Sequence, residues 1–155
     1  MVHFRLATRD DVPAIVRLLE DDEISGSRAR LVPEDADAAL WRAFEQIDED
    51  PRNELIVADA DGVVVGTCQL TFTPSLSRGG AERMTIEAVR VARTLRGQGV
   101  GREMMRWALE RARQRGCRLA QLTTDKRRTD AHRFYESLGF TASHVGMKLV
   151  IHRSD

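Results

Sequence analysis

The chain has 155 residues, of which 42% are hydrophobic and 31% are charged, and its formal net charge is zero. These values are ordinary for a soluble globular protein, and the length suits one domain with a real core, so we assign residues 1–155 to a single domain. No apolar run approaches the ~20 residues that span a bilayer, and the N-terminus has no basic segment followed by an apolar one. We therefore expect neither a membrane partner nor secretion.

The charges are unevenly placed along the chain. Residues 1–77 carry 7 Lys/Arg and 16 Asp/Glu, whereas residues 78–155 carry 17 and 8. The asymmetry suits a C-terminal half that holds a polyanion, or two oppositely charged faces of one domain. Only 5% of the residues are aromatic, and none alternate with the basic residues, so we expect no nucleic-acid partner.

Cys68 and Cys117 stand alone, without the spacing of metal ligands. We interpret them as two small buried hydrophobes with free thiols, which indicates the cytoplasm. No metal site is expected.

Periodicity and turn residues predict ten elements in one mixed α/β domain, in the order β-α-α-β-β-β-α-β-α-β. The hairpin is marked by Asp61-Gly62, and the third helix ends at Gly116. The expected strands are 3–8, two within 53–72, 82–92, 118–124 and 140–151, and the expected helices are 8–23, 33–47, 99–115 and 129–139.

The stretch RGQGVGR, residues 96–102, joins the expected strand 82–92 to the helix 99–115. Glycines at a helix N-terminus let an anion approach the unpaired N–H groups and the positive end of the dipole, so the stretch predicts a phosphate cradle. Gly101 is followed by Arg102-Glu103, which excludes a P-loop, and the spacing GxGxG does not match the dinucleotide fingerprint GxGxxG. A turn that only joins strand to helix is the structural alternative.

This stretch resembles a motif of the GCN5-related N-acetyltransferases (GNAT), Q/R-x-x-G-x-G/A. IEAVRV before it and DAHRFYESLGF after it look like the family's other landmarks, in the same order and spacing. The resemblance covers nearly the whole chain and implies a mixed, mostly antiparallel central sheet flanked by helices.

The resemblance also implies how acetyl-CoA would be held. The backbone of Val89, Arg90 and Val91 would pair with the pantetheine arm, and N–H groups of the glycine turn would hold the pyrophosphate. Arg96, Arg102 and the run Lys126-Arg127-Arg128 are candidates for phosphate charge, although the run also suits a solvated loop. Many relatives have Asn where this chain has Arg128, so that contact is absent or replaced. The implied cofactor-binding residues are Val89, Arg90, Val91, Arg96, Gly97, Gln98, Gly99, Val100, Gly101, Arg102 and Arg128.

Acetyl transfer to an amine needs a group that accepts the amine's proton and one that protonates the leaving thiolate. Tyr135, the one tyrosine, stands at the family's proton-donor position, with a core aromatic as the alternative role. Glu87 is the candidate base, because it shares strand parity with Val89 and Val91 in an apolar run, although a water or Asp125 could serve instead. His132, His144 and Cys117 are expected to be structural.

The expected function is acetyl-CoA-dependent N-acetylation of a primary amine, in a small molecule or a peptide, by direct attack in a ternary complex. Acidic residues at 20–23 and 48–50 favour a cationic acceptor, or are only solvated helix ends. A CoA-binding regulatory module without chemistry, or a protein that binds another nucleotide, are the alternatives, and a homodimer is left open.

Overall fold

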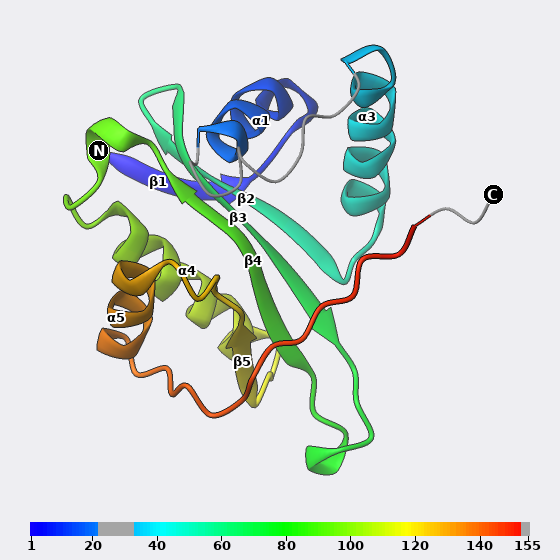
Figure 1. The fold of residues 1–155 in the computed structure, drawn as a ribbon, viewed down its shortest axis with the longest axis vertical. Coiled ribbons are helices and arrows are strands. Elements are labelled where there is room, and N and C mark those ends of the chain that lie inside the picture. Colours follow the sequence, from blue (N-terminus) through cyan, green and yellow to red (C-terminus); the bar gives the residue numbers. More distant parts are fainter. Residues whose placement is uncertain (22–32, 153–155) are drawn as a thin grey trace. The chain divides into compact units, whose positions relative to one another are not determined.

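The computed structural model describes residues 1–21 and 33–152, without the side chains of 33–36. Its contacts divide the chain into two compact units, Met1–Leu122 and Thr123–Asp155, and each is described by itself. The first unit contains β1 (Val2–Leu6), α1 (Val12–Glu20), α3 (Pro33–Glu49), β2 (Asn53–Ala60), β3 (Val63–Thr73), β4 (Arg83–Val91), α4 (Val100–Gln114) and β5 (Leu119–Leu122) (Figure 1). The second unit contains α5 (Thr129–Ser137).

The five strands form one sheet in the order β1-β2-β3-β4-β5. The first four are antiparallel to their neighbours, and β5 runs parallel to β4 because α4 carries the chain back across the sheet. The expected mixed, mostly antiparallel sheet with flanking helices is confirmed. No described helix is long and apolar enough to cross a membrane.

Each sheet face has its own core. One face packs against α4, whose apolar residues recur at helical spacing, and its fully buried residues include Ile56, Leu70, Phe72, Met84, Met104 and Met105. The other face packs against α1, where Ile15 meets Ala7 and Val57. Cys68 is fully buried, which raises its thiol pKa to about 12, so it behaves as the small hydrophobe expected from the sequence. Both cysteines are free thiols.

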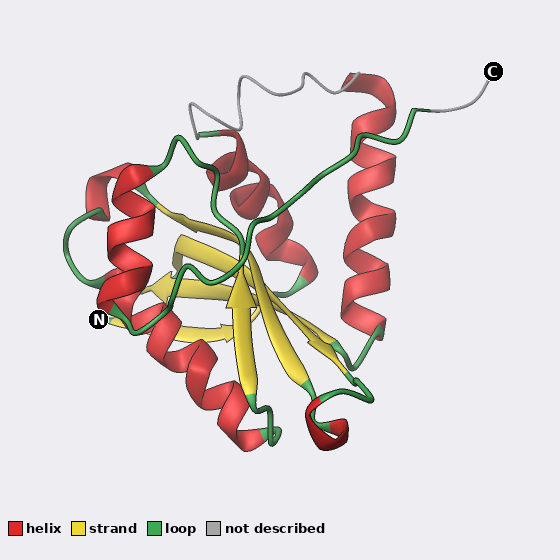
Figure 2. Cartoon of the chain, turned by 60° about the horizontal axis from the view of Figure 1, so that its bottom comes forward, coloured by secondary structure: helices red, strands yellow, loops and turns green. Residues whose placement is uncertain are grey.

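The expected strand at 140–151 is wrong, because residues 140–152 form no strand among the described residues (Figure 2). The alternation that predicted it is present in the sequence. A strand also requires a neighbour for its backbone groups, and the apolar side chains of this segment are exposed, Met147 by 92% and Leu149 by 84%. The single-domain assignment stays a prediction.

The start of α1 is tied to the sheet by Arg5 of β1. Its guanidinium donates to both carboxylate oxygens of Asp11, at 2.7 and 3.0 Å, and to Asp59 of β2 at 3.0 Å. Asp11 also accepts the Thr8 N–H at 2.7 Å, which caps the chain before the helix, and Asp59 accepts the Gly62 N–H at 2.7 Å. Hydrogen bonds from Arg5 hold the pKa of Asp11 below its usual value, and the Gly62 N–H followed by Arg5 does the same for the pKa of Asp59.

We expect Asp11→Asn to lower the free energy of unfolding at pH 7 by about 1.5–3 kcal/mol, because charge-assisted hydrogen bonds to a buried carboxylate are lost. Since the folded-state pKa of Asp11 is depressed, its stabilisation is complete above the unfolded pKa of about 3.9 and is lost as pH falls through the folded-state pKa. The deficit of the variant should therefore shrink below pH 4, as measured by urea unfolding between pH 7 and 2.5. Asp61→Asn, at a side chain that is 89% exposed, is the matched control and should cost under about 0.5 kcal/mol. Equal deficits for the two variants would contradict the role of Asp11.

Candidate active site

The strands β4 and β5 run together for only part of their length. Their pairing extends from Arg83 opposite Leu119 to Ile86 opposite Leu122, where β5 ends, while β4 continues to Val91. In the described part of the chain, residues 87–91 therefore have a strand neighbour on the β3 side only. An extended amide chain can pair with such an edge as an added strand.

Two carbonyls of this segment accept hydrogen bonds from arginine side chains. Arg90 Nη1 donates to the Val89 carbonyl at 2.8 Å, and Arg96 Nε donates to the Val91 carbonyl at 3.3 Å. These flexible donors satisfy the carbonyls where a fixed strand would otherwise do so. The carbonyls of the edge are thus hydrogen-bonded, but by side chains that another donor could replace.

A bulge at Ala88 changes which way the strand's side chains point. Gln69 lies opposite Glu87 and Thr67 lies opposite Arg90, so one residue of β3 faces two of β4, and Ala88 has a φ of +54°. Glu87 therefore shares a face with Arg90, whereas Val91 packs with Val100 on the α4 side. The expected common parity of Glu87 with Val89 and Val91 is wrong, because the bulge shifts the alternation by one residue.

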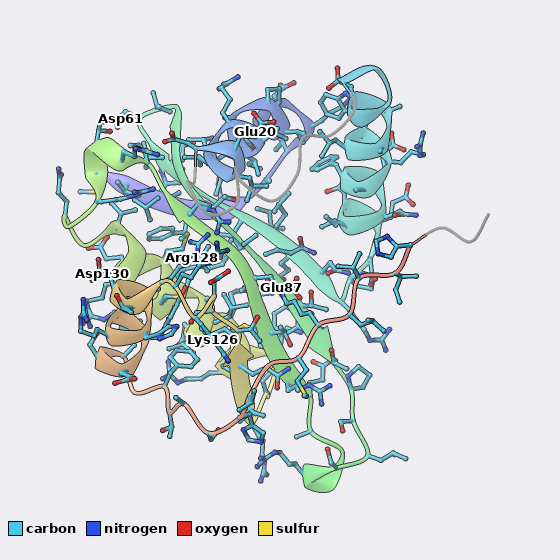
Figure 3. The ribbon with its side chains drawn as sticks, in the orientation of Figure 1. Glu20, Asp61, Glu87, Lys126, Arg128 and Asp130 are labelled. Atoms are coloured by element: carbon cyan, nitrogen blue, oxygen red, sulfur yellow. The ribbon has the colours of Figure 1, made fainter. Side chains whose placement is uncertain are left out.

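Glu87 belongs to a group of polar side chains on the α1 face of the sheet, beyond the area that α1 covers. Residues paired across neighbouring strands lie on the same face of the sheet. By this rule Gln69 lies beside Glu87, and a row crosses the sheet through Asn53, Thr71, Thr85 and Gln121. Thr85 Oγ1 accepts from Gln121 Nε2 at 3.2 Å, and Thr71 Oγ1 donates to Asn53 at 3.0 Å. Glu87 is exposed on its strand and has no ion pair among the described residues (Figure 3). We call these six residues the polar face.

The glycine turn leads from this strand directly into α4. Gly97 and Gly99 have φ of +79° and +87°, and a Cβ at either would have no other atom within 4 Å apart from its chain neighbours. The first helical hydrogen bond runs from the Glu103 N–H to the Gly99 carbonyl at 3.0 Å, so the N–H groups of Val100 and Gly101 lie outside the helical ladder. Val100 is buried against Ala58 and Val65, which fixes the turn on the sheet. The geometry fits an anion at the positive end of α4.

The site residues expected in the first unit are therefore contiguous in space as well as in sequence. Glu87, the β4 edge at 89–91 and the turn at 96–102 follow one another from strand to helix. Gln98 donates from its side chain to the Thr94 carbonyl at 3.1 Å and so braces the turn. If an extended amide chain that ends in an anionic group paired with this edge, its anionic group would lie at the N-terminus of α4.

The remaining expected residues lie in the second unit. Tyr135 is half-buried on α5 between two aromatic rings, with ring centroids 5.1 Å from Phe134 and 5.8 Å from Phe140. Both contacts are edge-to-face, which orients the ring. A packed phenol on a helix suits a positioned proton donor and a core aromatic alike, so its catalytic role stays a prediction.

The basic run of the second unit is partly engaged within its own turn. Arg127 donates from its backbone and its side chain to the Asp125 carboxylate, at 2.9 to 3.0 Å, and the Arg128 N–H donates to the Asp125 carbonyl at 3.0 Å before α5. Asp125 is thus tied to a cation and is poorly suited as a base. Lys126 is exposed, and Arg128 is half-buried at the N-cap of α5. His132 Nε2 lies 3.1 Å from the Asp125 carbonyl, as expected for a structural histidine.

The acidic residues expected at an acceptor entrance are only partly described, since Asp22 and Glu23 lie outside the described residues. Asp21 pairs with Arg93 at 3.2 Å beside a hollow of about 680 Å³ between α1 and the β2–β3 turn. Asp50 accepts from Arg52 N–H at 2.8 Å and from Asn53 at 3.1 Å. The Asp21 and Asp50 carboxylates are therefore occupied within the chain.

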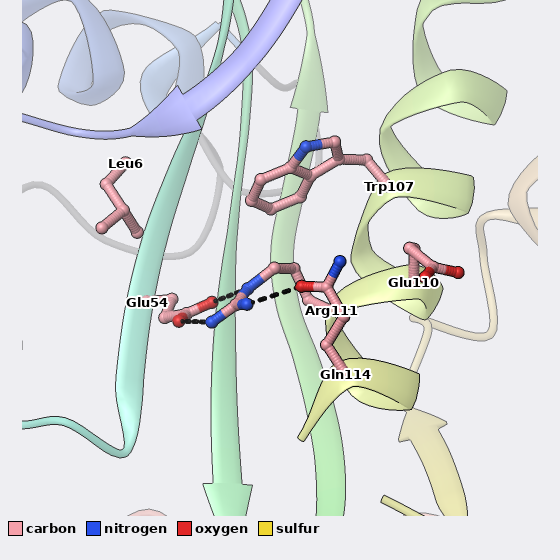
Figure 4. A pocket seen from close by; sticks show the side chains of 6 residues that line it. All are labelled: Leu6, Glu54, Trp107, Glu110, Arg111 and Gln114. Atoms are coloured by element: carbon pink, nitrogen blue, oxygen red, sulfur yellow. Dashed lines mark hydrogen bonds and ion pairs between the residues drawn. The ribbon is translucent and has the colours of Figure 1, made fainter. Parts of the chain in front are cut away.

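A second hollow, of about 370 Å³, lies against α4 away from the β4 edge. Figure 4 shows its main polar groups bonded to one another: Arg111 holds both oxygens of Glu54 and also donates to Gln114 at 2.8 Å. The Arg111 guanidinium in this hollow is therefore already hydrogen-bonded within the protein. We interpret Arg111 and Glu54 as a structural ion pair.

Sequence analysis did not predict three features of the site: the bulge, the polar face and the role of Gly66. Gly66 lies opposite Val91, and a Cβ there would come within 3.3 Å of the Arg90 carbonyl and 3.2 Å of the Ala58 Cβ. The bulge did leave a signal, because the apolar positions Met84 and Ile86 are even whereas Val89 and Val91 are odd. Among the described residues, no three His, Cys, Asp or Glu side chains gather as metal ligands.

Comparison with known proteins shows the family of the chain. An aminoalkylphosphonate N-acetyltransferase from Salmonella typhimurium is 38% identical over 95 residues, which is 61% of each chain, and a glucosamine 6-phosphate N-acetyltransferase from Trypanosoma brucei brucei is 34% identical over 88 residues, 57% of this chain and 58% of the relative. The matches thus span about three fifths of these curated relatives. A solved structure of a transcriptional regulator from Bacillus halodurans is 47% identical, with a TM-score of 0.91 over 97% of this chain and 100% of that one. The model of the acetyltransferase (GNAT) family matches residues 12–140, and the chain belongs to this family of acyl-CoA N-acyltransferases.

Proposed function

We propose that the protein transfers an acetyl group from acetyl-CoA to a primary amine of a small polar molecule, by direct attack in a ternary complex. The observation that carries the proposal is the β4 edge at 87–91, which leads through the glycine turn into the N-terminus of α4, where N–H groups lie outside the helical ladder. Pantetheine is an extended amide chain that ends in a pyrophosphate. The β4 edge offers backbone N–H and carbonyl groups for the amides, and the glycine turn that follows it offers N–H groups for the pyrophosphate.

The donor would lie along β4 with its amides paired to the backbone of Val89 and Val91. Arg90 and Arg96 would then release the two carbonyls to the N–H groups of the donor. The N–H groups of the glycine turn would hold the pyrophosphate, and Arg96 and Arg102 would add positive charge. Arg128, at the start of α5, is the proposed replacement for the family's asparagine.

Acetyl-CoA supplies an activated thioester, and the protein's residues would transfer protons from the amine and to the thiolate. Glu87, directly or through a water, would take a proton from the acceptor ammonium, so that the nitrogen attacks the carbonyl carbon. The new C–N bond forms as the C–S bond breaks. Tyr135 would donate its phenolic proton to the departing thiolate, and the second proton that the nitrogen loses as the amide forms would restore the phenol through water.

The polar face supports a small polar acceptor. Gln69 lies opposite Glu87, and Thr85, Thr71 and Gln121 follow on the same face of the sheet with neutral donors and acceptors. This lining suits an acceptor that carries hydroxyl or phosphoryl groups beside its amine. The two curated relatives are named for acceptors of that kind. A panel of aminoalkylphosphonates, hexosamine phosphates, aminoglycosides and peptide lysines, assayed by release of free thiol, would identify the class.

A regulatory module that binds CoA without turnover is the second candidate, since the similar structure from Bacillus halodurans is described as a transcriptional regulator. The presence of both Glu87 and Tyr135 favours chemistry. Turnover with any amine of the panel would exclude the regulatory alternative as the sole function. A cytoplasmic location, indicated by the free cysteines, belongs to the same proposal.

Gly99→Glu should abolish the rise in melting temperature that CoA produces. The substitution places a negative side chain at the turn, whereas the unmodified protein should gain about 2.7 kcal/mol at a CoA concentration of 100 times Kd. Gly116→Glu is the matched control, because Gly116 also has a positive φ, +78°, and open space but lies at the far end of α4. Thermal scans with and without CoA would compare the three proteins. An equal shift for Gly99→Glu and Gly116→Glu would overturn the cradle.

Tyr135→Phe should lower kcat by ~10²–10⁴-fold, because the ring and its packing remain while the proton donor is lost. The affinity for acetyl-CoA, measured by calorimetry, should change little. Ser137→Ala removes a hydroxyl from the same helix and should keep kcat within about twofold of the parent. Near-full kcat in Tyr135→Phe with a good amine would mean that another group protonates the thiolate.

Glu87→Gln should show a deficit in kcat/KM that shrinks as pH rises towards the amine pKa of about 10.4, where the amine loses its proton unaided. Rates would be measured from pH 7 to 10. Glu110→Gln, an exposed acid on α4, controls for the loss of one charge and should follow the parent profile. A deficit that stays constant across this range would remove Glu87 from the role of base.

A further inference from the structure

Arg83, the first residue of β4, carries a positive charge for which the described part of the chain supplies no partner. The side chain is half-buried, its Nε is buried without a hydrogen-bond partner, and no described acid pairs with its guanidinium. Glu82, its neighbour in sequence, is held by Arg115 at 3.3 Å. Arg90, whose Nε is buried as well, is engaged through Nη1 with the Val89 carbonyl. Burying a charged donor without a partner is unfavourable, so a bound anion at Arg83 would be stabilising.

Arg83 lies on the same side of the sheet as the candidate base. Side chains alternate along β4, and the stretch from Arg83 through Thr85 to Glu87 precedes the bulge at Ala88, so these three side chains face the same way. The two residues between them are buried on the α4 side. Thr73 of β3 lies opposite Arg83 and adds a further hydroxyl to this side. Arg83 therefore extends the polar face at the end away from the glycine turn.

The two charged side chains, Arg83 and Glu87, are too far apart along the strand to neutralise one another directly. Four residues of an extended strand separate their Cα atoms by about 13 Å. Between them lie neutral groups of the polar face, such as Thr85 Oγ1 and Gln121 Nε2, which bond to each other at 3.2 Å. A ligand that is positive at Glu87 and negative at Arg83 would complement both charges. A ligand with a second positive charge would be repelled by Arg83.

We infer that Arg83 binds an oxyanion of the acceptor, so that the acceptor is a small zwitterion: an amine that also carries a phosphonate, phosphate or carboxylate group. This inference rests on the proposed function for the role of the amine. A guanidinium suits such a group because its planar N–H fork donates to two oxygens at once. With its amine at Glu87 and its oxyanion at Arg83, the acceptor would lie along β4 with its nitrogen at the start of the open edge. Asp21 and Asp50, the described acids expected to attract a cationic acceptor, are by contrast occupied within the chain.

Rates of thiol release from acetyl-CoA would compare three anionic amines (aminoethylphosphonate, O-phosphoethanolamine and β-alanine) with neutral ethanolamine and dicationic diaminopropane. The unmodified protein should favour the best anionic amine over ethanolamine by roughly 10–100-fold in kcat/KM, as charge-assisted hydrogen bonds imply, and should not favour diaminopropane. The three anionic amines distinguish phosphonate, phosphate and carboxylate.

Arg83→Gln should remove this preference, mainly by raising KM for the anionic amine. Arg118→Gln removes the same charge at an exposed side chain next to β5 and is the matched control, which should keep the preference. An unmodified protein without the preference, or an Arg83→Gln variant that retains it, would overturn the inference and leave acetyl transfer to other amines standing.

Binding measured without turnover separates this inference from the proposed function. Calorimetry with the three anionic amines, with and without CoA, should show binding to the unmodified protein that Arg83→Gln weakens by roughly 10–100-fold. Arg83→Lys keeps the charge without the planar fork and should restore part of the affinity. Cooperative thermal unfolding of each variant without ligand would show that it folds.

Binding that depends on Arg83 in a protein that acetylates none of the amines would refute the proposed transfer and support the anion site. Absence of binding by all three anionic amines, or equal affinity in the unmodified protein and Arg83→Gln, would overturn the anion site whether or not the protein acetylates other amines.

Discussion

The candidate site depends on the point at which two strands part. β4 and β5 are paired up to Ile86 and Leu122, and beyond that point β4 continues without β5. Backbone polar groups need partners wherever they lie, so this half-open strand must either bind something extended or be satisfied by side chains. In this structure, arginine side chains satisfy the Val89 and Val91 carbonyls. An extended ligand with amide groups would satisfy them in their place.

The bulge determines what lies on each side of that edge. By shifting the alternation at Ala88, it directs Val91 into the core under α4 and keeps Glu87 on the opposite face with Arg90. A regular strand would have turned either the acid towards the core or the valine towards solvent. The left-handed backbone at Ala88 costs some stability, and its position beside the candidate base is where such strain commonly has a use.

The features predicted from sequence are those that short-range rules decide. The hairpin at Asp61-Gly62, the glycine turn and α4 follow from turn chemistry and periodicity over a few residues, and the three motifs predicted the fold and the family. The strand predicted at 140–151 shows the limit, because alternation describes which side of a strand is apolar but not which edge it joins. The polar face was also missed, since Gln69, Thr85 and Gln121 come together only through register between strands. The roles of Tyr135 and Glu87 stay predictions, because a residue's place in a motif does not measure proton transfer.

Gly66 extends the site beyond the residues that would touch a ligand. Gly66 lies on β3 between Val91 of β4 and Ala58 of β2, and even a methyl group there would come within 3.3 Å of the Arg90 carbonyl and 3.2 Å of the Ala58 Cβ. The position of the β4 backbone at Arg90 therefore depends on a residue of the neighbouring strand. Affinity for an extended ligand can then be tuned, or lost, by a substitution that alters neither the charge nor the shape of the surface that the ligand meets.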